Sequence, residues 1–218
     1  MAGRQTKVIV EVGSRRVFAS ALDWPGWCRA AKDEEGALAS LAAYAPRYAV
    51  VAERAGVPFR PATTYDVVDR VDGDATTDFG APGRVTAADA EPLSAAEARR
   101  QVALLRAAWA ELDRLAVEAP EVLRKGPRGG GRDRDKIVAH VLGAEGAYAR
   151  KVGVRHPEAG LGDSAAIAAA REDLAAVLEG ARSGEPVVER GWPPRYALRR
   201  VAWHVLDHVW EIEDKSEA

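Results

Sequence analysis

The chain has 218 residues, of which 31 are basic and 33 acidic, with four histidines and a single cysteine. Hydrophobic residues at 47% and charged residues at 29% are typical of a folded globular chain, and the length allows one large domain or two small ones. A net charge of −2 argues against a nucleic-acid or acidic-lipid binder, and one cysteine excludes an internal disulfide or a multi-cysteine metal site. A bound metal would therefore need histidine and carboxylate ligands.

The first 80 residues alternate between strand-like and helix-like patterns. Apolar residues alternate in 8–12, which predicts a strand. Two further short strands are predicted at 17–22 and 27–31, and turn-forming residues separate the three runs. Asp33 is a suitable N-cap for a helix, because two glutamates follow it in the first turn. An isolated run at 65–71 predicts one more strand. We therefore expect a small α+β unit here.

The rest of the chain is predicted to be helical. Ser94 and Glu97 have the spacing of a capping box at the start of the first of four amphipathic stretches. Four such helices with connecting loops indicate a four-helix bundle. A stretch rich in glycine, proline and aspartate precedes them and indicates a linker. The predicted fold class is thus α+β, with domains at 1–80 and 94–218 joined by a linker at 81–93.

Three of the four histidines occupy inward-facing helix positions. His204 and His208 are four residues apart, so on a helix they lie on one face, which is the apolar stripe of the last helix. His140 lies beside the apolar stripe of an earlier helix. Three neutral imidazoles can hold Zn²⁺ or another divalent ion and leave a coordination position free for water or substrate. Burial in a core or a place on the surface is the alternative for each, and His156 is expected to be solvated in a loop.

Two stretches resemble the metal-bearing helices of the DinB-like family: KIVAHVLGAEGAYARKVG at 136–153 and RRVAWHVLDHVWEIED at 199–214. That family is a four-helix bundle with a divalent metal held by three histidines. Many members are S-transferases or isomerases that use bacillithiol, mycothiol or glutathione. The resemblance covers the predicted bundle and implies zinc, with nickel or manganese as alternatives, and a low-molecular-weight thiol as cosubstrate. The implied metal ligands are His140, His204 and His208.

Two carboxylates of the last helix are placed to orient a ligand histidine. Glu211 lies three residues after His208, and Asp207 lies three residues after His204. A carboxylate that accepts a hydrogen bond from a ring N–H fixes the orientation of the imidazole. Glu211 is the stronger candidate because it shares a face with both histidines. For either carboxylate, a surface position in an ion pair is the alternative.

Basic residues at two places are candidates for contact with an anionic substrate. A glycine-rich stretch before the second predicted helix carries Arg128 and Arg132, and helix N-termini attract anions. Arg199 and its neighbour Arg200 lie about one turn before His204. The glycine-rich stretch lacks the spacing of a phosphate-binding loop or a dinucleotide fingerprint. A solvated connection is therefore the alternative for that stretch, and ordinary surface contacts are the alternative for the two arginines.

The N-terminal region resembles the HicB-like antitoxin fold over about residues 7–55. The resemblance rests on two strands, the turn LDWPGWC at 22–28 and a helix that opens with acidic residues. Such domains neutralise an RNA-targeting toxin or accompany a DNA-binding module. Residues 1–80 carry ten basic and eleven acidic side chains, which is a poor basis for binding nucleic acid. We interpret the region as a module that packs on the bundle, mediates dimerisation or covers the mouth of the site. Cys28 within it is expected to be a small buried hydrophobe.

The leading hypothesis is a divalent-metal-dependent thiol S-transferase or thiol-dependent isomerase. Its partners would be a small-molecule thiol and an electrophilic substrate, and an arginine- and alanine-rich composition favours mycothiol as the thiol. The alternative is a non-catalytic metal- or ligand-binding protein, or a regulatory protein that acts through the HicB-like region. We expect no nucleic-acid or membrane partner and allow for a homodimer. Because the chain has neither a signal-like apolar core at its start nor an apolar run of about 20 residues, a cytoplasmic location is expected.

Overall fold

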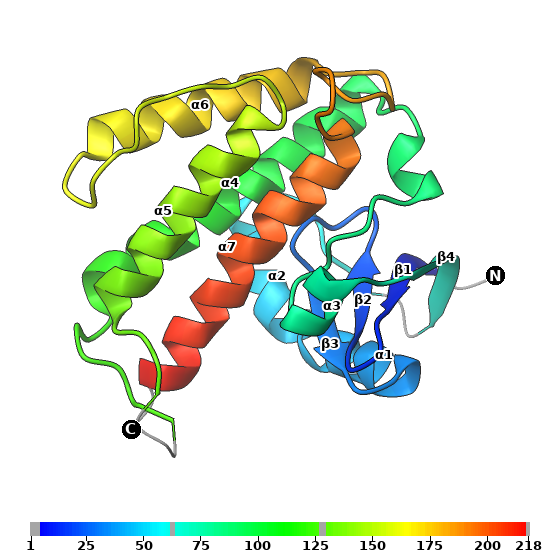
Figure 1. Ribbon diagram of the computed structural model, residues 1–218, viewed down its shortest axis with the longest axis horizontal. Helices are drawn as coiled ribbons and strands as arrows, with labels where there is room; N and C mark the ends of the chain where they lie inside the picture. The colour runs from blue at the N-terminus through cyan, green and yellow to red at the C-terminus, as the bar shows by residue number, and fades with distance from the viewer. Residues whose placement is uncertain (1–4, 62–63, 127–129, 217–218) are drawn as a thin grey trace.

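A computed structural model describes residues 5–61, 64–126 and 130–216 (Figure 1). The fold is α+β, as predicted: a four-stranded sheet with its helices comes first, and four long helices that pack on one another follow. In the described part of the chain, no helix is long and apolar enough to cross a membrane.

The sheet is mixed, with the strands in the order β3-β2-β1-β4. β1 pairs antiparallel with β2, and β2 with β3, as short turns between consecutive strands allow. β4 follows two helices in the chain and pairs parallel with β1. Along β4, half-buried and exposed residues alternate, as in an edge strand with one face toward solvent. The strand bounds are Thr6–Val12 (β1), Val17–Ala21 (β2), Cys28–Ala31 (β3) and Tyr65–Asp72 (β4).

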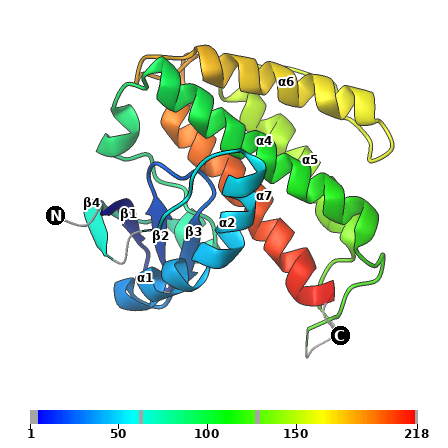
Figure 2. The ribbon, with the colours of Figure 1, turned by 180° about the vertical axis from the view of Figure 1, so that it is seen from behind.

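The middle of the sheet is covered on both faces, and every residue of β2 is buried. Helix α1 (Glu34–Ala43) packs on β2 and β3, and its N-cap is Asp33, whose side chain accepts a hydrogen bond from the backbone N–H of Gly36 at 2.8 Å. Helix α2 (Ala45–Arg54) continues toward the bundle and packs on α4 (Figure 2). From the strands, Phe18 and Cys28 pack against Trp203 near the C-terminus of the chain.

The segment that precedes the bundle is attached to both parts of the molecule. Helix α3 (Ala75–Phe79) and the 3-10 helix η1 (Ala87–Ala90) lie in this segment. Glu11 of β1 accepts hydrogen bonds from the backbone N–H groups of Gly83 and Arg84, both at 3.0 Å. Asp89 of η1 is fully buried against Arg199. These contacts hold the segment against the sheet on one side and the last helix on the other.

Four helices form the C-terminal bundle: α4 (Ala95–Glu118), α5 (Arg134–Arg150), α6 (Ser164–Gly180) and α7 (Pro194–Ser216). The predicted capping box is present at the start of α4, where Ser94 and Glu97 each accept a hydrogen bond from the other's backbone N–H. α4 packs along both α6 and α7, and α5 packs along α7. Apolar side chains from the stripes of these helices fill the centre of the bundle.

Helix α7 belongs to both parts of the fold, and Figure 1 shows it between the sheet and the other long helices. Gly26, in the turn between β2 and β3, has φ +91, and a Cβ there would come within 2.6 Å of Leu206 on α7. Glycine is the residue that allows both this backbone conformation and this close approach. The ring of Trp203 packs edge-on against Phe18 at 6.1 Å. As a result, α7 is buried on nearly all sides.

Candidate metal centre

Two helices bring three histidines together. His204 and His208 lie one turn apart on α7, and they are only 7% and 9% exposed. His140 comes from α5, which packs along α7. One candidate ligand atom from each of the three side chains lies within 4.8 Å of the others. This His triad could hold a divalent metal ion, as the spacing of the histidines predicts.

His140 is exposed, in contrast to the inward position that its pattern predicted. The buried residues of α5 include Ile137, Val141 and Glu145, so the buried stripe is centred between Val141 and Glu145. At 100° per residue, His140 lies roughly 120° around the helix from that centre. It therefore sits at the edge of the packed face, which gives the His triad one side toward solvent.

One distance in the His triad equals that expected at a tetrahedral ion. Nε2 of His140 lies 3.3 Å from Nε2 of His204. Two nitrogens bound to one tetrahedral zinc at about 2.0–2.1 Å lie about 3.3–3.4 Å from each other. The ring centroids are 4.8 to 5.1 Å apart and the ring planes are inclined by 61° to 89°. The rings are therefore not stacked, and imidazole is a donor that suits zinc, nickel and copper.

The environment favours neutral imidazoles. Burial lowers the pKa of His204 to about 2, and the neighbouring His208 and His140 act in the same direction. Desolvation also lowers the pKa of His140, with a further contribution from the positive charge of Arg132. Nδ1 of His204 is buried, and it has no hydrogen-bond partner among the residues described. The neutral ring is the form that binds a metal.

A carboxylate anchors one ring of the His triad. Oε2 of Glu211 lies 2.7 Å from Nδ1 of His208, and Lys215 donates a hydrogen bond to the other carboxylate oxygen. The hydrogen bond from His208 lowers the pKa of Glu211 to about 2, and Lys215 contributes to the same shift. A ring that donates its Nδ1 proton to Glu211 keeps the lone pair of Nε2 free. The contact therefore orients His208 for ligation.

Asp207, the other predicted carboxylate, makes a different contact. Its Oδ1 accepts a hydrogen bond from Nη1 of Arg29 on β3 at 3.1 Å. The side chain thus points toward the sheet and forms an ion pair, the alternative that the sequence left open. The described contacts of Asp207 do not include His204, so its orienting role stays a prediction.

The predicted anion contacts divide into three cases. Arg199 is buried and donates from Nε and Nη2 to the two oxygens of Asp89 at 2.9 and 2.7 Å, so it is not free to meet a substrate. Arg132 is exposed, and its charge lies close enough to lower the pKa of both His140 and His204. Arg128 lies outside the described residues.

An aromatic wall with a positive charge borders the His triad. The rings of Tyr148 and Trp203 lie 5.6 and 5.9 Å from that of His204. The guanidinium of Arg200 lies over both aromatic rings, at 5.5 Å from Tyr148 and 4.8 Å from Trp203. The sequence singled out neither aromatic residue as part of the site. A spacing of eight residues from His140 on the same helix is the signal that could have identified Tyr148.

The remaining histidine and the cysteine lie apart from the His triad. His156 is exposed, with Nε2 at 2.8 Å from Oδ2 of Asp173 on α6. Cys28 is buried under Trp203 and accepts a hydrogen bond from Ser20 at 3.0 Å. Burial raises the pKa of its thiol to about 12, so it stays protonated. Both findings agree with the predicted roles of these residues.

Comparison with models of known protein families, with curated proteins and with solved structures found no match to this chain. What the structure shows is a four-stranded mixed sheet followed by a helical bundle that carries a His triad.

Proposed function

We propose that this protein is a divalent-metal-dependent transferase that joins a low-molecular-weight thiol to an electrophilic substrate, or an isomerase that uses such a thiol. The observation that carries the proposal is the convergence of His140, His204 and His208. Three neutral protein ligands leave a fourth position for an incoming group, whereas closed structural zinc sites have four protein ligands. His140 is exposed, so the His triad has one side toward solvent.

Zinc is the ion that this donor set suits best, with nickel as an alternative. Manganese is a further alternative that rests on the resemblance to the DinB-like family alone. When bound, a divalent ion lowers the pKa of a coordinated thiol and so supplies a thiolate nucleophile at neutral pH. Glu211 holds the ring of His208 in its ligating orientation. Tyr148 and Trp203 exclude water from one side of His204.

Positive charge around the His triad supports an anionic ligand there. Arg200 and Arg132 both act on His204 through their charge. In the described part of the chain, Glu211 is the only carboxylate hydrogen-bonded to a triad histidine, and Lys215 compensates its charge. A thiolate, or a substrate with a carboxylate group, would therefore be attracted to the site.

The choice of a thiol rests on the resemblance of 136–153 and 199–214 to the DinB-like family, and the choice of mycothiol on the arginine- and alanine-rich composition. No side chain of the protein itself offers a competing thiol, because Cys28 is buried and protonated. A sulfur nucleophile would have to arrive as a bound small molecule.

Metal analysis of protein purified without chelator tests the first half of the proposal. We expect close to one equivalent of a divalent metal, lost in His204→Ala and retained in His156→Ala, which removes the histidine outside the His triad. The second half is tested by titrating cobalt-substituted protein with mycothiol and with its disulfide. We expect a thiolate-to-cobalt absorption band with the thiol alone.

Protein that carries no metal would contradict the whole proposal. Protein that binds metal but shows no thiol-dependent band would contradict the transferase and favour the non-catalytic binding protein. Co-purification of a small basic protein with the sheet region would favour the regulatory alternative.

A further inference from the structure

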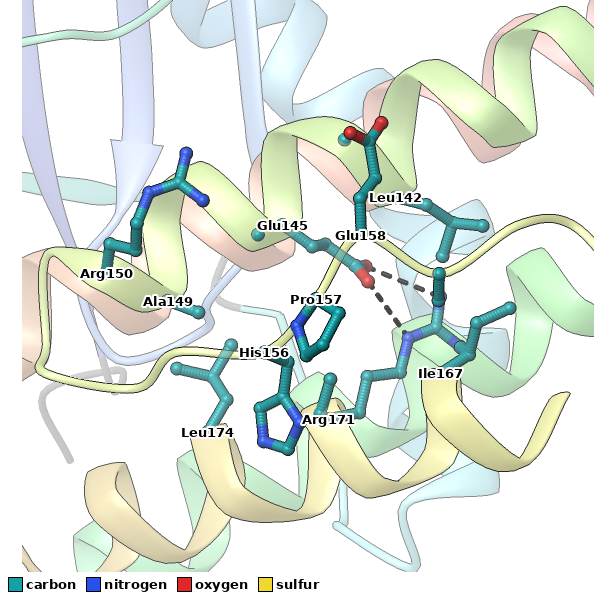
Figure 3. A pocket seen from close by; sticks show the side chains of 14 residues that line it. Leu142, Glu145, Ala149, Arg150, His156, Pro157, Glu158, Ile167, Arg171 and Leu174 are labelled. Atoms are coloured by element: carbon teal, nitrogen blue, oxygen red, sulfur yellow. Dashed lines mark hydrogen bonds and ion pairs between the residues drawn. The ribbon is translucent and has the colours of Figure 1, made fainter. Parts of the chain in front are cut away.

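Cavities outside the His triad differ in the balance of their charges. In the cavity between α5 and α6, Arg171 donates hydrogen bonds to both oxygens of Glu145 (Figure 3). Arg150 and Glu158 complete its charged lining, so cations and carboxylates are equal in number there. A cleft of about 420 Å³ between the sheet and the start of α4, which we name the β1–α4 cleft, is different. It has an excess of positive charge.

The β1–α4 cleft lies where four segments of the chain meet. They are the start of β1, the turn between β2 and β3, the chain after α2 and the first turns of α4. None of the described residues that line it belongs to α5 or α7, the helices that carry the His triad. Its volume falls within the range of about 300–1,000 Å³ that is usual for small-molecule sites. The cleft is therefore separate from the His triad and large enough for a small organic ligand.

Three basic side chains from three of these segments line the cleft: Lys7, Arg60 and Arg100. Lys7 and Arg60 are exposed, and neither forms an ion pair in the described part of the chain. Arg100 is held in place, because its Nη1 donates to the backbone oxygen of Asp23 at 2.6 Å. Its guanidinium also lies 4.0 Å from the centre of the Trp24 ring. Positive charges gathered in one cleft attract an anion.

The two carboxylates of the lining do not cancel this charge. Asp23 pairs at 3.4 Å with Arg195, a buried residue outside the lining. Glu97 accepts a hydrogen bond from the backbone N–H of Ser94 in the capping box. Hydrogen bonds from Ser94 lower the pKa of Glu97, and the charges of Arg195 and Lys7 act in the same direction. With Arg195 included, four cations are present for two carboxylates.

A buried amide in the lining lacks a hydrogen-bond partner. Gln101 is only 1% exposed, and its Oε1 accepts no hydrogen bond in the part of the chain that the structure describes. A buried acceptor without a donor is costly, and a hydroxyl group of a ligand would supply one. Gln5 and Thr6 add further polar side chains to the lining. A hydroxylated ligand therefore fits this cleft better than an apolar one.

A phosphate monoester suits the charge of the cleft. It carries about 1.5 to 2 negative charges at pH 7 and three oxygens that accept hydrogen bonds. Arginine binds phosphate through two parallel hydrogen bonds, and lysine binds it as a point charge. Because the three basic residues come from different segments, they can approach different oxygens of one phosphate. A carboxylate offers a single charge and two oxygens, which matches the excess of two cations less well.

We propose that the β1–α4 cleft binds a small phosphorylated sugar or polyol. Lys7, Arg60 and Arg100 hold its phosphate, and one of its hydroxyl groups donates to Gln101. The proposal does not depend on the function proposed for the His triad.

Glucose 6-phosphate is the probe, and isothermal titration calorimetry of the full chain measures its affinity. The controls are glucose, which lacks the phosphate, inorganic phosphate, which lacks the sugar, and gluconate, which carries a carboxylate in place of the phosphate. We expect glucose 6-phosphate to bind at least about tenfold more tightly than each control. Affinity no greater than that for inorganic phosphate would overturn the sugar, equal affinity for gluconate would overturn the phosphate, and no binding would overturn the whole proposal.

The variant Arg60→Gln tests the location. The side chain is exposed, so the fold should be kept, and circular dichroism checks this. We expect affinity for glucose 6-phosphate to fall by about tenfold, because a charge-assisted hydrogen bond is lost. The matched control is Arg155→Gln, which removes an exposed arginine outside the cleft. Parent-like affinity in Arg60→Gln, or an equal loss in both variants, would overturn the location.

The variant Gln101→Leu tests the contact with the sugar. It removes the amide together with its unpartnered oxygen, so we expect a melting temperature no lower than that of the parent protein. Affinity for glucose 6-phosphate should fall several-fold, and affinity for inorganic phosphate should stay the same. Unchanged affinity for glucose 6-phosphate would overturn the hydroxyl contact.

Treatment with a chelator separates the cleft from the His triad. A phosphate that binds to a metal ion there would be lost with the metal, whereas binding in the β1–α4 cleft should not change. A loss of affinity for glucose 6-phosphate on metal removal would overturn the assignment to the cleft.

Discussion

Arg199 and His204 lie five residues apart on α7, yet they belong to polar clusters of opposite kinds. Asp89 accepts two hydrogen bonds from Arg199 and two from Thr86, so both oxygens of this buried carboxylate are hydrogen-bonded. His204 is about as buried as Arg199, at 7% against 5% exposed. Its Nδ1 has no partner among the residues described, and its Nε2 faces only another imidazole.

The difference between the two clusters separates a structural role from a binding role. Buried polar groups are costly unless they are hydrogen-bonded. The Asp89–Arg199 pair meets that requirement within the chain and joins η1 to α7. His204 does not meet it among the residues described, and an ion bound to the His triad would give this ring a polar partner. The two clusters should therefore respond to mutation in different ways.

The largest expected effect comes from Asp89→Ala. It leaves Arg199 buried without a counter-ion, and breaking such a pair costs about 3–5 kcal/mol of folding free energy. Urea denaturation measures this loss, and the metal content per folded molecule should stay unchanged. A cost of under about 1 kcal/mol would mean that water replaces the carboxylate, and would remove the contrast with the His triad.

His204→Ala should act on the metal and not on the fold. Loss of a residue that hydrogen-bonds a metal ligand lowers metal affinity by about 10–100-fold. We expect a larger fall here, because a ligand itself is lost. Competition with a colorimetric chelator measures the affinity, and circular dichroism checks that the helices remain. The matched control is His156→Ala, because His156 contacts Asp173 outside the His triad. Parent-like affinity in His204→Ala would disprove its assignment as a ligand.

Glu211→Gln should weaken metal binding by about 10–100-fold, because the ring of His208 loses the carboxylate that orients it. The glutamine keeps the size of the side chain, so unfolding by urea should change little. The same chelator competition gives the result. Should the affinity stay the same, the contact between Glu211 and His208 has no part in the site.

The smallest effect is expected for Asp207→Asn, whose side chain pairs with Arg29 of the sheet. Its partially exposed ion pair with Arg29 is worth at most about 1 kcal/mol. Metal affinity should be that of the parent protein, and urea denaturation should show only a slight loss of stability. A fall in metal affinity comparable to that of Glu211→Gln would show that both carboxylates serve the His triad.

Local sequence patterns were sufficient for the four strands, the helix after Asp33 and the four long helices, and for part of the site. The capping interactions of Asp33 and Ser94 involve partners three residues away, so the chain near them carries the whole signal. The same holds for the position of His204 and His208 on one face of a helix, and for the contact of Glu211 with His208.

Longer-range relations were decided only when the elements packed together. Three ion pairs could not be predicted from local spacing. They are Asp207 with Arg29, Asp89 with Arg199, and Glu145 with Arg171. Each of these pairs joins residues from different elements, between 26 and 178 positions apart in the chain. The physical reason is that spacing along the chain places a side chain on a face of its own helix but does not say which other element packs against that face.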